Sequence, residues 1–498
     1  MKLLIYILVF VPLLHGFVMP NQTNTTHQTR VQMVITAADG KKLQAVSIEK
    51  PNKIDANIVV NPKEKFQKIV GIGGSFTQST SYLLTQLSEN KKNEILEAYF
   101  GEKGAQYSLC RTHINSCDFS LSQYAYVNDA KDEKLESFSI KPDQEQIIPI
   151  IKQAQKIAKY DFKLIASPWT APPYMKDNNQ WKGGKLLPQF YPQWALYFVK
   201  YIQAYQKENI NIWGVTFQNE PLGNDNNWES MHFNPQEMNE FVTNYLKPSF
   251  TNNAVKAKIL GYDQNRDDEM KEWANAMYTN SENKSSYDGM AIHWYASTFD
   301  YFPESLNKVH QLAPNKHLIQ TEACIDAEKP RWNDDAWYWN KEAKDWGWTW
   351  APENKKHLHP KYAPVNRYAQ DIIGCLNNWV DGWIDWNMVL DENGGPNWAK
   401  NWCTAPVIVN TKTDEVYYTP LYYILSQFSR NIAPNAQRIG ITNSDKTINC
   451  TAVENPDGSI AIFIFNEHLE AKGISLTIHE QKIDFTLQAQ ALQTLIIH

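Results

Sequence analysis

The chain has 498 residues, 43% of them hydrophobic, which is long for one ordinary compact domain and sufficient for a large core. Its 48 Lys and Arg nearly balance its 54 Asp and Glu, for a net charge of -6, which argues against nucleic-acid binding and leaves no basic stripe for an anionic membrane. Aromatic residues make up 13%, with 18 Trp. Because flat aromatic rings stack on the C–H faces of sugars, this content favours a carbohydrate ligand, although a large aromatic core would account for it as well.

The N-terminus has the pattern of a secretory signal peptide. Residues 1–20 contain Lys2 and then an apolar run over 3–14, which is too short to span a bilayer. We expect cleavage near Gly16 and export through the secretory pathway, to the exterior, the periplasm or a lysosome according to the source. An uncleaved anchor is the alternative. No later stretch is long and apolar enough for a membrane helix, so a soluble mature chain is expected.

Short β-type runs at 31–36, 43–48 and 58–60 precede a long region in which apolar runs alternate with segments of helical period. The predicted strands of this region are 67–73, 107–112, 163–167, 212–218, 258–262, 289–294, 318–321 and 382–387. The helices predicted between them are 144–159, 192–207, 235–245, 267–278 and 364–379. Eight strand–helix units are the number of a closed (β/α)8 barrel of the TIM type.

From about residue 432 the pattern is β again. Runs at 459–465 and 474–478 alternate, and Asn455-Pro456-Asp457-Gly458 has the composition of a hairpin turn. The sequence therefore predicts an α/β protein with a catalytic barrel over 66–431. An accessory β-sandwich is expected from both chain ends, 31–65 and 432–498.

The cysteines are Cys110, Cys117, Cys324, Cys375, Cys403 and Cys450. An even number in a secreted chain permits disulfides. A chain of this size does not need them, and several of these cysteines lie in apolar runs, so buried free thiols are favoured. No group of Cys and His has the spacing of a zinc site, and we expect neither a metal nor a cofactor.

Two glutamates follow apolar strands. Glu220 comes after Phe217-Gln218-Asn219, and Glu322 comes after Ile319-Gln320-Thr321, at the ends of the fourth and seventh predicted barrel strands. Barrel enzymes carry their chemistry at this end of the strands. Glycoside hydrolysis needs two carboxyl groups across the scissile bond. Either Glu alone is more often a surface or salt-bridged residue, but the pair on one rim predicts a glycosidase.

Several blocks resemble the glucosylceramidase-like enzymes of glycoside hydrolase family 30. These blocks are Gly71-Ile72-Gly73-Gly74, Cys117-Asp118-Phe119-Ser120, Ala166-Ser167-Pro168-Trp169-Thr170-Ala171-Pro172-Pro173, Asn219-Glu220-Pro221, Ile292-His293-Trp294-Tyr295, Thr321-Glu322-Ala323-Cys324, Asp385-Trp386-Asn387 and Gly394-Gly395-Pro396-Asn397-Trp398. They occur in order from residue 71 to 398. The resemblance implies a barrel joined to a β-sandwich.

The resemblance also implies roles for individual residues. Glu220 matches the family's acid/base and Glu322 its nucleophile. The positions that match substrate-binding or pocket residues are Asp118, Trp169, Asn219, His293, Tyr295, Trp386 and Asn397, and Arg111 matches an arginine beneath the site. Without the resemblance, Trp169 and Trp386 would equally be core aromatics, Asp118 a turn cap and His293 a structural histidine.

One segment departs from the family pattern. Residues 326–362, after the proposed nucleophile, carry Trp332, Trp337, Trp339, Trp346, Trp348 and Trp350. This segment is interpreted either as a wall for the leaving group or as a packed flap. The chemical identity of the leaving group therefore stays undetermined.

The function predicted from sequence is a retaining exo-β-glycosidase acting on terminal β-glucosides. Glucosylceramide is the leading substrate, with peripheral contact to membrane lipid. A β-1,6-glucanase or β-xylosidase is the alternative within the family. An inactive carbohydrate- or lipid-binding protein on the same scaffold is the alternative of another class.

Overall fold

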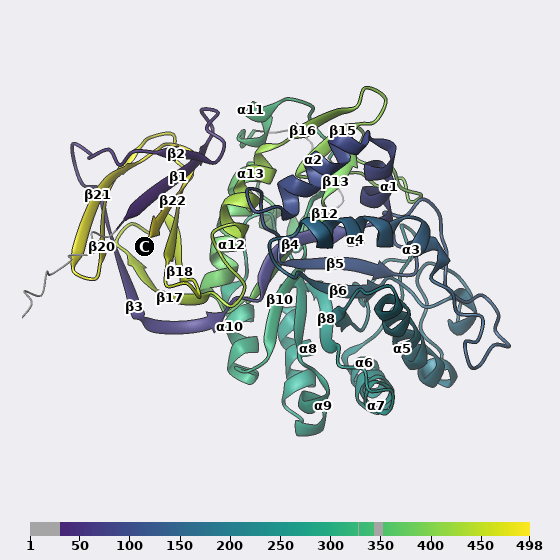
Figure 1. Cartoon of the computed structure of the whole chain (residues 1–498). Helices are drawn as coiled ribbons and strands as arrows, with labels where there is room; N and C mark the ends of the chain where they lie inside the picture. Colours follow the sequence, from purple (N-terminus) through teal and green to yellow (C-terminus); the bar gives the residue numbers. More distant parts are fainter. Residues whose placement is uncertain (1–29, 327, 343–351) are drawn as a thin grey trace, which may run out of the picture.

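The computed structural model describes residues 30–326, 328–342 and 352–498. Two bodies lie side by side, a barrel ringed by helices and a smaller domain made of strands (Figure 1). Within the described residues, no helix is long and apolar enough to cross a membrane.

The barrel is closed by eight parallel strands, in the order β10-β12-β4-β5-β6-β7-β8-β9. Their bounds are β4 Gly71–Phe76, β5 Leu109–Ile114, β6 Lys163–Pro168, β7 Ile212–Thr216, β8 Lys258–Asn265, β9 Gly289–His293, β10 His317–Glu322 and β12 Gly382–Asn387. Every predicted run overlaps one of these strands, and the predicted fold class is confirmed.

Helices cover the barrel on its outside (Figure 1). The longer ones are α1 Gln78–Gln86, α2 Glu89–Phe100, α4 Ile147–Ile157, α5 Tyr191–Lys207, α8 Glu269–Tyr278, α10 Pro303–Leu312, α12 Pro364–Asn377 and α13 Pro420–Ser429. The shorter ones are α3 Lys141–Glu145, α6 Pro235–Phe241, α7 Lys247–Asn252, α9 Ser281–Ser286 and α11 Asp335–Tyr338. The predicted helices do not include α1, α2, α9, α10, α11 or α13.

The helix predicted over 235–245 is longer and irregular. It begins as α6, widens into a π-turn over Val242–Leu246, and continues as α7. Pro248 has no N–H to donate and its ring crowds the preceding turn, which is a known cause of such widening. The periodicity that marks a regular helix is therefore interrupted at this point.

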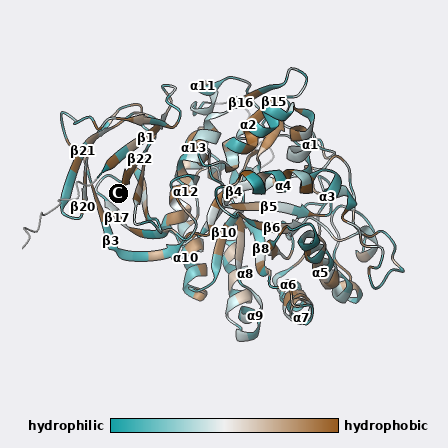
Figure 2. Ribbon diagram, viewed as in Figure 1, coloured by the Kyte–Doolittle hydropathy of each residue, from teal (hydrophilic) through white to brown (hydrophobic). Residues whose placement is uncertain are grey.

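The accessory domain is one hydrogen-bonded sheet in the order β2-β1-β22-β19-β18-β17-β3-β20-β21. Its strands are β1 Val31–Ala37, β2 Gln44–Val46, β3 Ala56–Lys68, β17 Gln437–Asn443, β18 Asn449–Glu454, β19 Ile460–Asn466, β20 Lys472–Ile478, β21 Gln481–Leu487 and β22 Ala491–Ile497. The sheet folds over an aliphatic core, and hydrophilic residues colour the outside of β3 (Figure 2). Both chain ends contribute strands to this domain.

The chain passes from one domain to the other within two residues. The N–H of Ile69 donates to Ala436 beside the accessory sheet, whereas the N–H of Val70 donates to Asp381 beside the barrel. The strand predicted over 67–73 is therefore divided, with its first residues in β3 and its last in β4. A continuous apolar run cannot reveal this change of partner.

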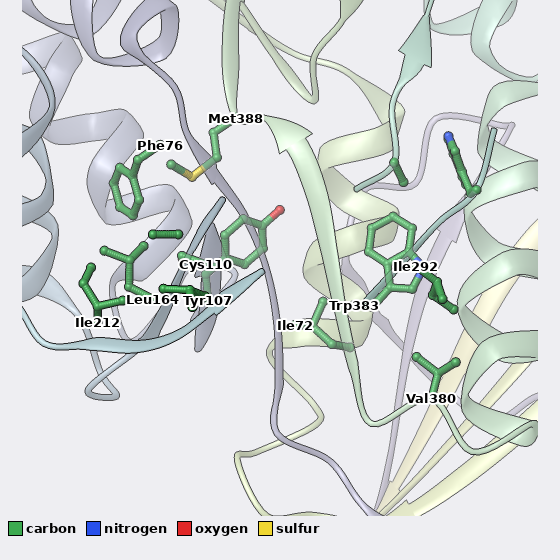
Figure 3. Close-up of a cluster of buried hydrophobic side chains, with 14 of the residues drawn as sticks. Ile72, Phe76, Tyr107, Cys110, Leu164, Ile212, Ile292, Val380, Trp383 and Met388 are labelled. Atoms are coloured by element: carbon green, nitrogen blue, oxygen red, sulfur yellow. The ribbon is translucent and has the colours of Figure 1, made fainter. Parts of the chain in front are cut away.

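Side chains on the barrel strands alternate between two environments. Outward residues pack against the helices, and Figure 3 shows part of this cluster, including Ile72, Cys110 and Trp383. The inward residues form a smaller apolar cluster that contains Leu109, Ile165, Leu260, Ala291, Ile319 and Ile384. Because side chains alternate with a period of two, the next inward positions lie one layer nearer the C-terminal ends of the strands. Those positions are polar or aromatic, and they build the site described next.

Candidate active site

The two predicted carboxylates meet at the C-terminal end of the barrel. Glu322 is the last residue of β10, and Glu220 follows β7 after a short turn. One carboxylate oxygen of each, together with a ring nitrogen of His293, lies within 4.8 Å of the others. Retaining glycosidases place their two carboxyl groups about 5–5.5 Å apart, whereas inverting enzymes need about 6.5–9.5 Å to admit a water. The observed spacing suits attack by one of the carboxylates themselves.

Arg111 lies beneath this pair, fully buried, two residues beyond Leu109 on β5. Its guanidinium donates to Glu322 Oε2, to Asn219 Oδ1 at 2.8 Å and to Asp263 Oδ2 at 2.8 Å. Its Nε donates to a serine hydroxyl at 3.0 Å. The planar guanidinium of Arg111 thus fixes the orientation of both Glu322 and Asn219.

Asp263 anchors the floor of the site through a bulge in β8. The register of β8 shifts between Tyr262 and Gln264, and Asp263 has φ +58°, so its side chain turns into the barrel. Its carboxylate accepts hydrogen bonds from the hydroxyls of Thr216 and Thr321 at 2.6 Å each. Burial raises the pKa of Asp263, but Arg111 and His293 outweigh it and hold the pKa well below its usual value. Asp263 is therefore a fixed negative charge.

His293 joins Asp263 to Glu220. One ring nitrogen lies 3.1 Å from Asp263 Oδ1 and the other 3.2 Å from Glu220 Oε1. Burial lowers the pKa of His293, yet the charges of Glu322 and Asp263 raise it overall to about 9. A protonated ring donates from both nitrogens and holds the Glu220 carboxyl in place.

The backbone at Glu220 is held in a conformation that non-glycine residues seldom adopt. Glu220 has φ +46°. Its N–H donates to the carbonyl of Asp263 at 2.9 Å, and its carbonyl accepts from Gly223 at 2.7 Å. A strained backbone conformation of this kind persists only where surrounding contacts hold it in place, and such conformations are frequent at functional sites. This conformation directs the Glu220 side chain over the end of the barrel.

Glu322 is nearly buried and held on both oxygens. Arg111 donates to one oxygen, and the hydroxyl of Tyr295 donates to the other at 3.0 Å. Burial raises the pKa of Glu322 above its usual value, and the positive charges of His293 and Arg111 offset this rise only in part. These contacts leave the carboxylate with a fixed orientation.

A cavity of about 540 Å³ opens above these groups. Its lining residues are Asp118, Phe119, Trp169, Asn219, Glu220, Gly223, Asn224, Asn227, Trp228, Gln264, Asn265, Tyr295, Glu322, Cys324, Asp326, Trp386, Asn401 and Cys403. Trp169 and Trp386 stack on each other at 5.1 Å between ring centroids, and the Arg111 guanidinium lies 5.0 Å and 5.5 Å from their rings.

Asp118 gives the cavity an unused acceptor. Its Oδ2 accepts from the amide of Asn401 at 3.4 Å, whereas its buried Oδ1 has no hydrogen-bond partner within the described part of the chain. Burial, and then the nearby negative charge of Glu322, raises the pKa of Asp118 well above its usual value. An acceptor left open beside aromatic rings suits the hydroxyl groups of a sugar.

The structure brings most of the predicted residues together at one cavity. Asp118, Trp169, Asn219, Tyr295 and Trp386 line the cavity with both glutamates, whereas His293 lies below it. Asn397 does not line the cavity, because its side chain bonds to the backbone of Asn401. Asn401 lines the cavity, and its amide donates to Asp118. The dipeptide Asn-Trp occurs at 397–398 and again at 401–402. Only the conformation of the loop shows which of the two asparagines lines the cavity.

The sequence interpretation also missed Asp263. Its signal was a carboxylate at the end of the fifth barrel strand, within Gly261-Tyr262-Asp263. The predicted strand ends at residue 262, one residue before Asp263. Only the bulge in β8 shows that it faces the interior.

The three described tryptophans of the Trp-rich segment pack away from the cavity, although Asp326 at the start of the segment lines it. Trp337 and Trp339 are buried, and Trp332 contacts Tyr417 at 5.9 Å between ring centroids. None of the three lines the cavity, so they form a packed flap. Trp346, Trp348 and Trp350 lie outside the described residues.

Replacing Arg111 by Met is expected to lower the free energy of unfolding by about 3–5 kcal/mol, because two buried carboxylates lose their guanidinium partner. Urea titration followed by tryptophan fluorescence measures the change. The control is Lys185→Met, which removes an exposed ion pair to Glu237 and is expected to cost less than about 1 kcal/mol. Equal losses in the two variants would contradict a central role for Arg111.

Comparisons with known proteins agree with this geometry. A sequence model of the glycosyl hydrolase family 30 TIM-barrel domain matches residues 69–345 and 353–432, and one of the family's beta sandwich domain matches 435–495. The chain is 31% identical over 438 residues to the lysosomal acid glucosylceramidase of Mus musculus, covering 86% of this chain and 80% of that protein.

Two solved structures are similar over 94% of this chain and 99% of theirs. SrfJ from Salmonella typhimurium has a TM-score of 0.82 and 27% identity. The endo-β-1,6-glucanase BT3312 has a TM-score of 0.79 and 28% identity.

Proposed function

The chain belongs to glycosyl hydrolase family 30 and is a β-glycosidase, and we propose that it removes terminal β-glucosyl residues with retention of configuration. The spacing of Glu220 and Glu322, within 4.8 Å, carries this proposal. Glucosylceramide is the leading substrate, because a mouse relative of 31% identity is a glucosylceramidase.

In the first step of this mechanism, Glu322 attacks the anomeric carbon while Glu220 gives a proton to the leaving oxygen. Arg111 and the Tyr295 hydroxyl hold Glu322 in line for attack. The carboxylate becomes a glycosyl ester. A water then enters, Glu220 takes its proton, and the sugar leaves with its β configuration restored.

The cavity supports a role in holding one sugar ring. The stacked Trp169 and Trp386 offer an aromatic wall, and the open Asp118 oxygen accepts hydroxyl hydrogens. The amide nitrogen of Asn219 remains available to a hydroxyl, because its oxygen already accepts from Arg111. Bonds to the sugar that tighten in the transition state accelerate the reaction.

A substrate panel tests the proposal. We expect release of glucose from a chromogenic β-glucoside and from glucosylceramide presented in detergent, with β-glucose as the first product by NMR. Failure on every β-glucoside in the panel would instead support an inactive binding protein. An α-glucose first product would overturn the retaining mechanism.

A β-1,6-linked glucan is the second candidate, and the polar part of the cavity lining favours it. This part comprises Asn224, Asn227, Gln264, Asn265 and Asp326, and the lining also contains Trp228. Amide and carboxyl groups beside a flat ring suit a hydroxylated leaving group better than acyl chains. Endo cleavage would release oligosaccharides, and exo cleavage glucose alone.

Replacing Asn227 by Leu is expected to lower kcat/KM for a β-1,6-linked disaccharide by about tenfold, the equivalent of one lost hydrogen bond of roughly 1.4 kcal/mol. The value for an aryl glucoside should stay nearly constant, because its leaving group makes no such bond. Asn226→Leu is the matched control, since Asn226 is exposed and does not line the cavity. If Asn227→Leu instead improves glucosylceramide hydrolysis and leaves the disaccharide unaffected, the saccharide candidate is wrong.

The apolar run over 3–14 supports export of the protein, and we assign it to the secretory pathway. N-terminal sequencing of the protein from its native source tests this assignment. A mature protein that begins at Met1 would contradict it.

A further inference from the structure

Two cysteines face each other in the wall of the active-site cavity. All six cysteines are free and buried. The thiol of Cys324 donates to the sulfur of Cys403, with 3.4 Å between the two Sγ atoms. Both residues line the cavity, so a small solute that enters the site can reach them.

Backbone pairing holds the two thiols in this position. Cys324 precedes β11 Ile325–Asp326, and Cys403 begins β14 Cys403–Thr404. The two strands pair antiparallel, with Ile325 opposite Thr404 and Asp326 opposite Cys403. The pairing joins the segment after the nucleophile to the loop that carries Asn401.

The pair is connected to the proposed nucleophile. The hydroxyl of Tyr295 lies 3.3 Å from Cys324 Sγ and 3.0 Å from Glu322 Oε1. Cys324 is also only two residues beyond Glu322 in the chain. Any movement of its sulfur therefore changes the surroundings of a hydroxyl that holds Glu322.

We propose that Cys324 and Cys403 form a reversible dithiol–disulfide site that lowers the activity of the enzyme when oxidised. The oxidant is a small disulfide such as glutathione disulfide. The Cys403 thiolate attacks one sulfur of the oxidant and displaces a thiolate, giving a mixed disulfide. Cys324, after losing its proton, attacks Cys403 Sγ and displaces the second thiolate. The protein loses two protons and two electrons, and the small disulfide becomes two thiols.

The order of attack follows from the surroundings of the sulfurs. The hydrogen bond from Cys324 lowers the pKa of Cys403, although burial and Asp326 raise it overall. Burial raises the pKa of Cys324 well above its usual value. Cys403 therefore becomes a thiolate more readily and reacts first.

Oxidation must move the sulfurs together. A disulfide bond is about 2.05 Å long, so a separation of 3.4 Å has to close by more than about 1 Å. The movement also alters the contact between Cys324 Sγ and the Tyr295 hydroxyl. Because displacements of about 1 Å around reacting groups can cost about 100-fold in rate, we expect oxidation to lower kcat/KM by roughly 10- to 100-fold.

The test oxidises the full-length protein with glutathione disulfide, alkylates the remaining thiols and maps peptides by mass spectrometry. We expect a peptide pair linked through Cys324 and Cys403, together with the fall in kcat/KM for an aryl glucoside. Dithiothreitol should restore both. The activity measurement depends on the proposed function, whereas detection of the linked peptide does not. A protein that forms the linked peptide but hydrolyses no β-glucoside would contradict the proposed function and the regulation of activity, but not the disulfide itself.

Three variants complete the test, each compared with its own reduced form. Cys403→Val should lose the linked peptide and keep its activity in the oxidant, whereas Cys324→Ala, which lacks the resolving thiol, should lose the linked peptide and accumulate the mixed disulfide at Cys403. Cys450→Ala, in the accessory domain, should respond as the parent does. Absence of the linked peptide in the parent would overturn the proposal, as would equal inactivation of the parent and Cys403→Val.

Discussion

Replacing Glu322 by Gln is expected to reduce kcat/KM for an aryl β-glucoside by about 10,000-fold or more, the scale seen when a covalent nucleophile is removed. The amide occupies the same space but cannot form the glycosyl ester. It also loses the ion pair to Arg111. Stopped assays at high enzyme concentration measure the residual rate.

A slow 2-fluoro-glucoside distinguishes a nucleophile from a structural carboxylate. The fluorine slows both steps, so the ester accumulates, and peptide mapping should place the adduct on Glu322. Unchanged folding of Glu322→Gln, checked by circular dichroism, excludes simple loss of structure. An adduct on another carboxylate would reassign the nucleophile.

Replacing Glu220 by Gln is expected to reduce turnover of a poor leaving group by about 100- to 10,000-fold, the usual contribution of a general acid. Activated aryl glucosides should keep a measurable first step, because their leaving oxygen needs little protonation. A burst of the released phenol, followed by a slow steady rate, is the expected kinetic signature.

Azide provides the control for the second step. It needs no general base, so it should accelerate turnover of the Glu220→Gln variant and yield β-glucosyl azide. An α-glucosyl azide would show that the enzyme inverts, and the assignment of both glutamates would fail. No effect of azide would contradict the role of Glu220 in the second step.

The barrel was predictable because its strands are short apolar runs separated by long helical segments. The run at 382–387 coincides with β12, and the run at 163–167 lies within β6. The first strand was not placed correctly, since Ile69 and Val70 belong to one apolar run but bond to different domains. The helix α1 was missed because its polar residues Gln78, Ser79 and Thr80 are buried against hydrogen-bonding neighbours, so it lacks a clear apolar face.

The site was predictable where a residue lies in a motif next to a strand, as for Glu220 and Glu322. The site was not predictable where contacts between distant segments determine which residue faces the cavity. The bulge that turns Asp263 inward is a register shift between strands, and the loop that presents Asn401 in place of Asn397 is closed by hydrogen bonds between those two residues. The contact between Cys324 and Cys403 joins residues far apart in sequence, and neither residue's local sequence indicates the other.

The pairing of both chain ends in one sheet also determines when the protein can fold during its synthesis. Strand β22 lies between β1 and β19, and Val31 pairs with Ile497 at the end of the chain. At roughly 5–20 residues per second, the ribosome needs on the order of tens of seconds to deliver β22 after β1 has emerged. During that interval β1 and β3 expose unpaired edges that can associate with other chains. Removal of β22 would leave the edges of β1 and β19 that face it unpaired.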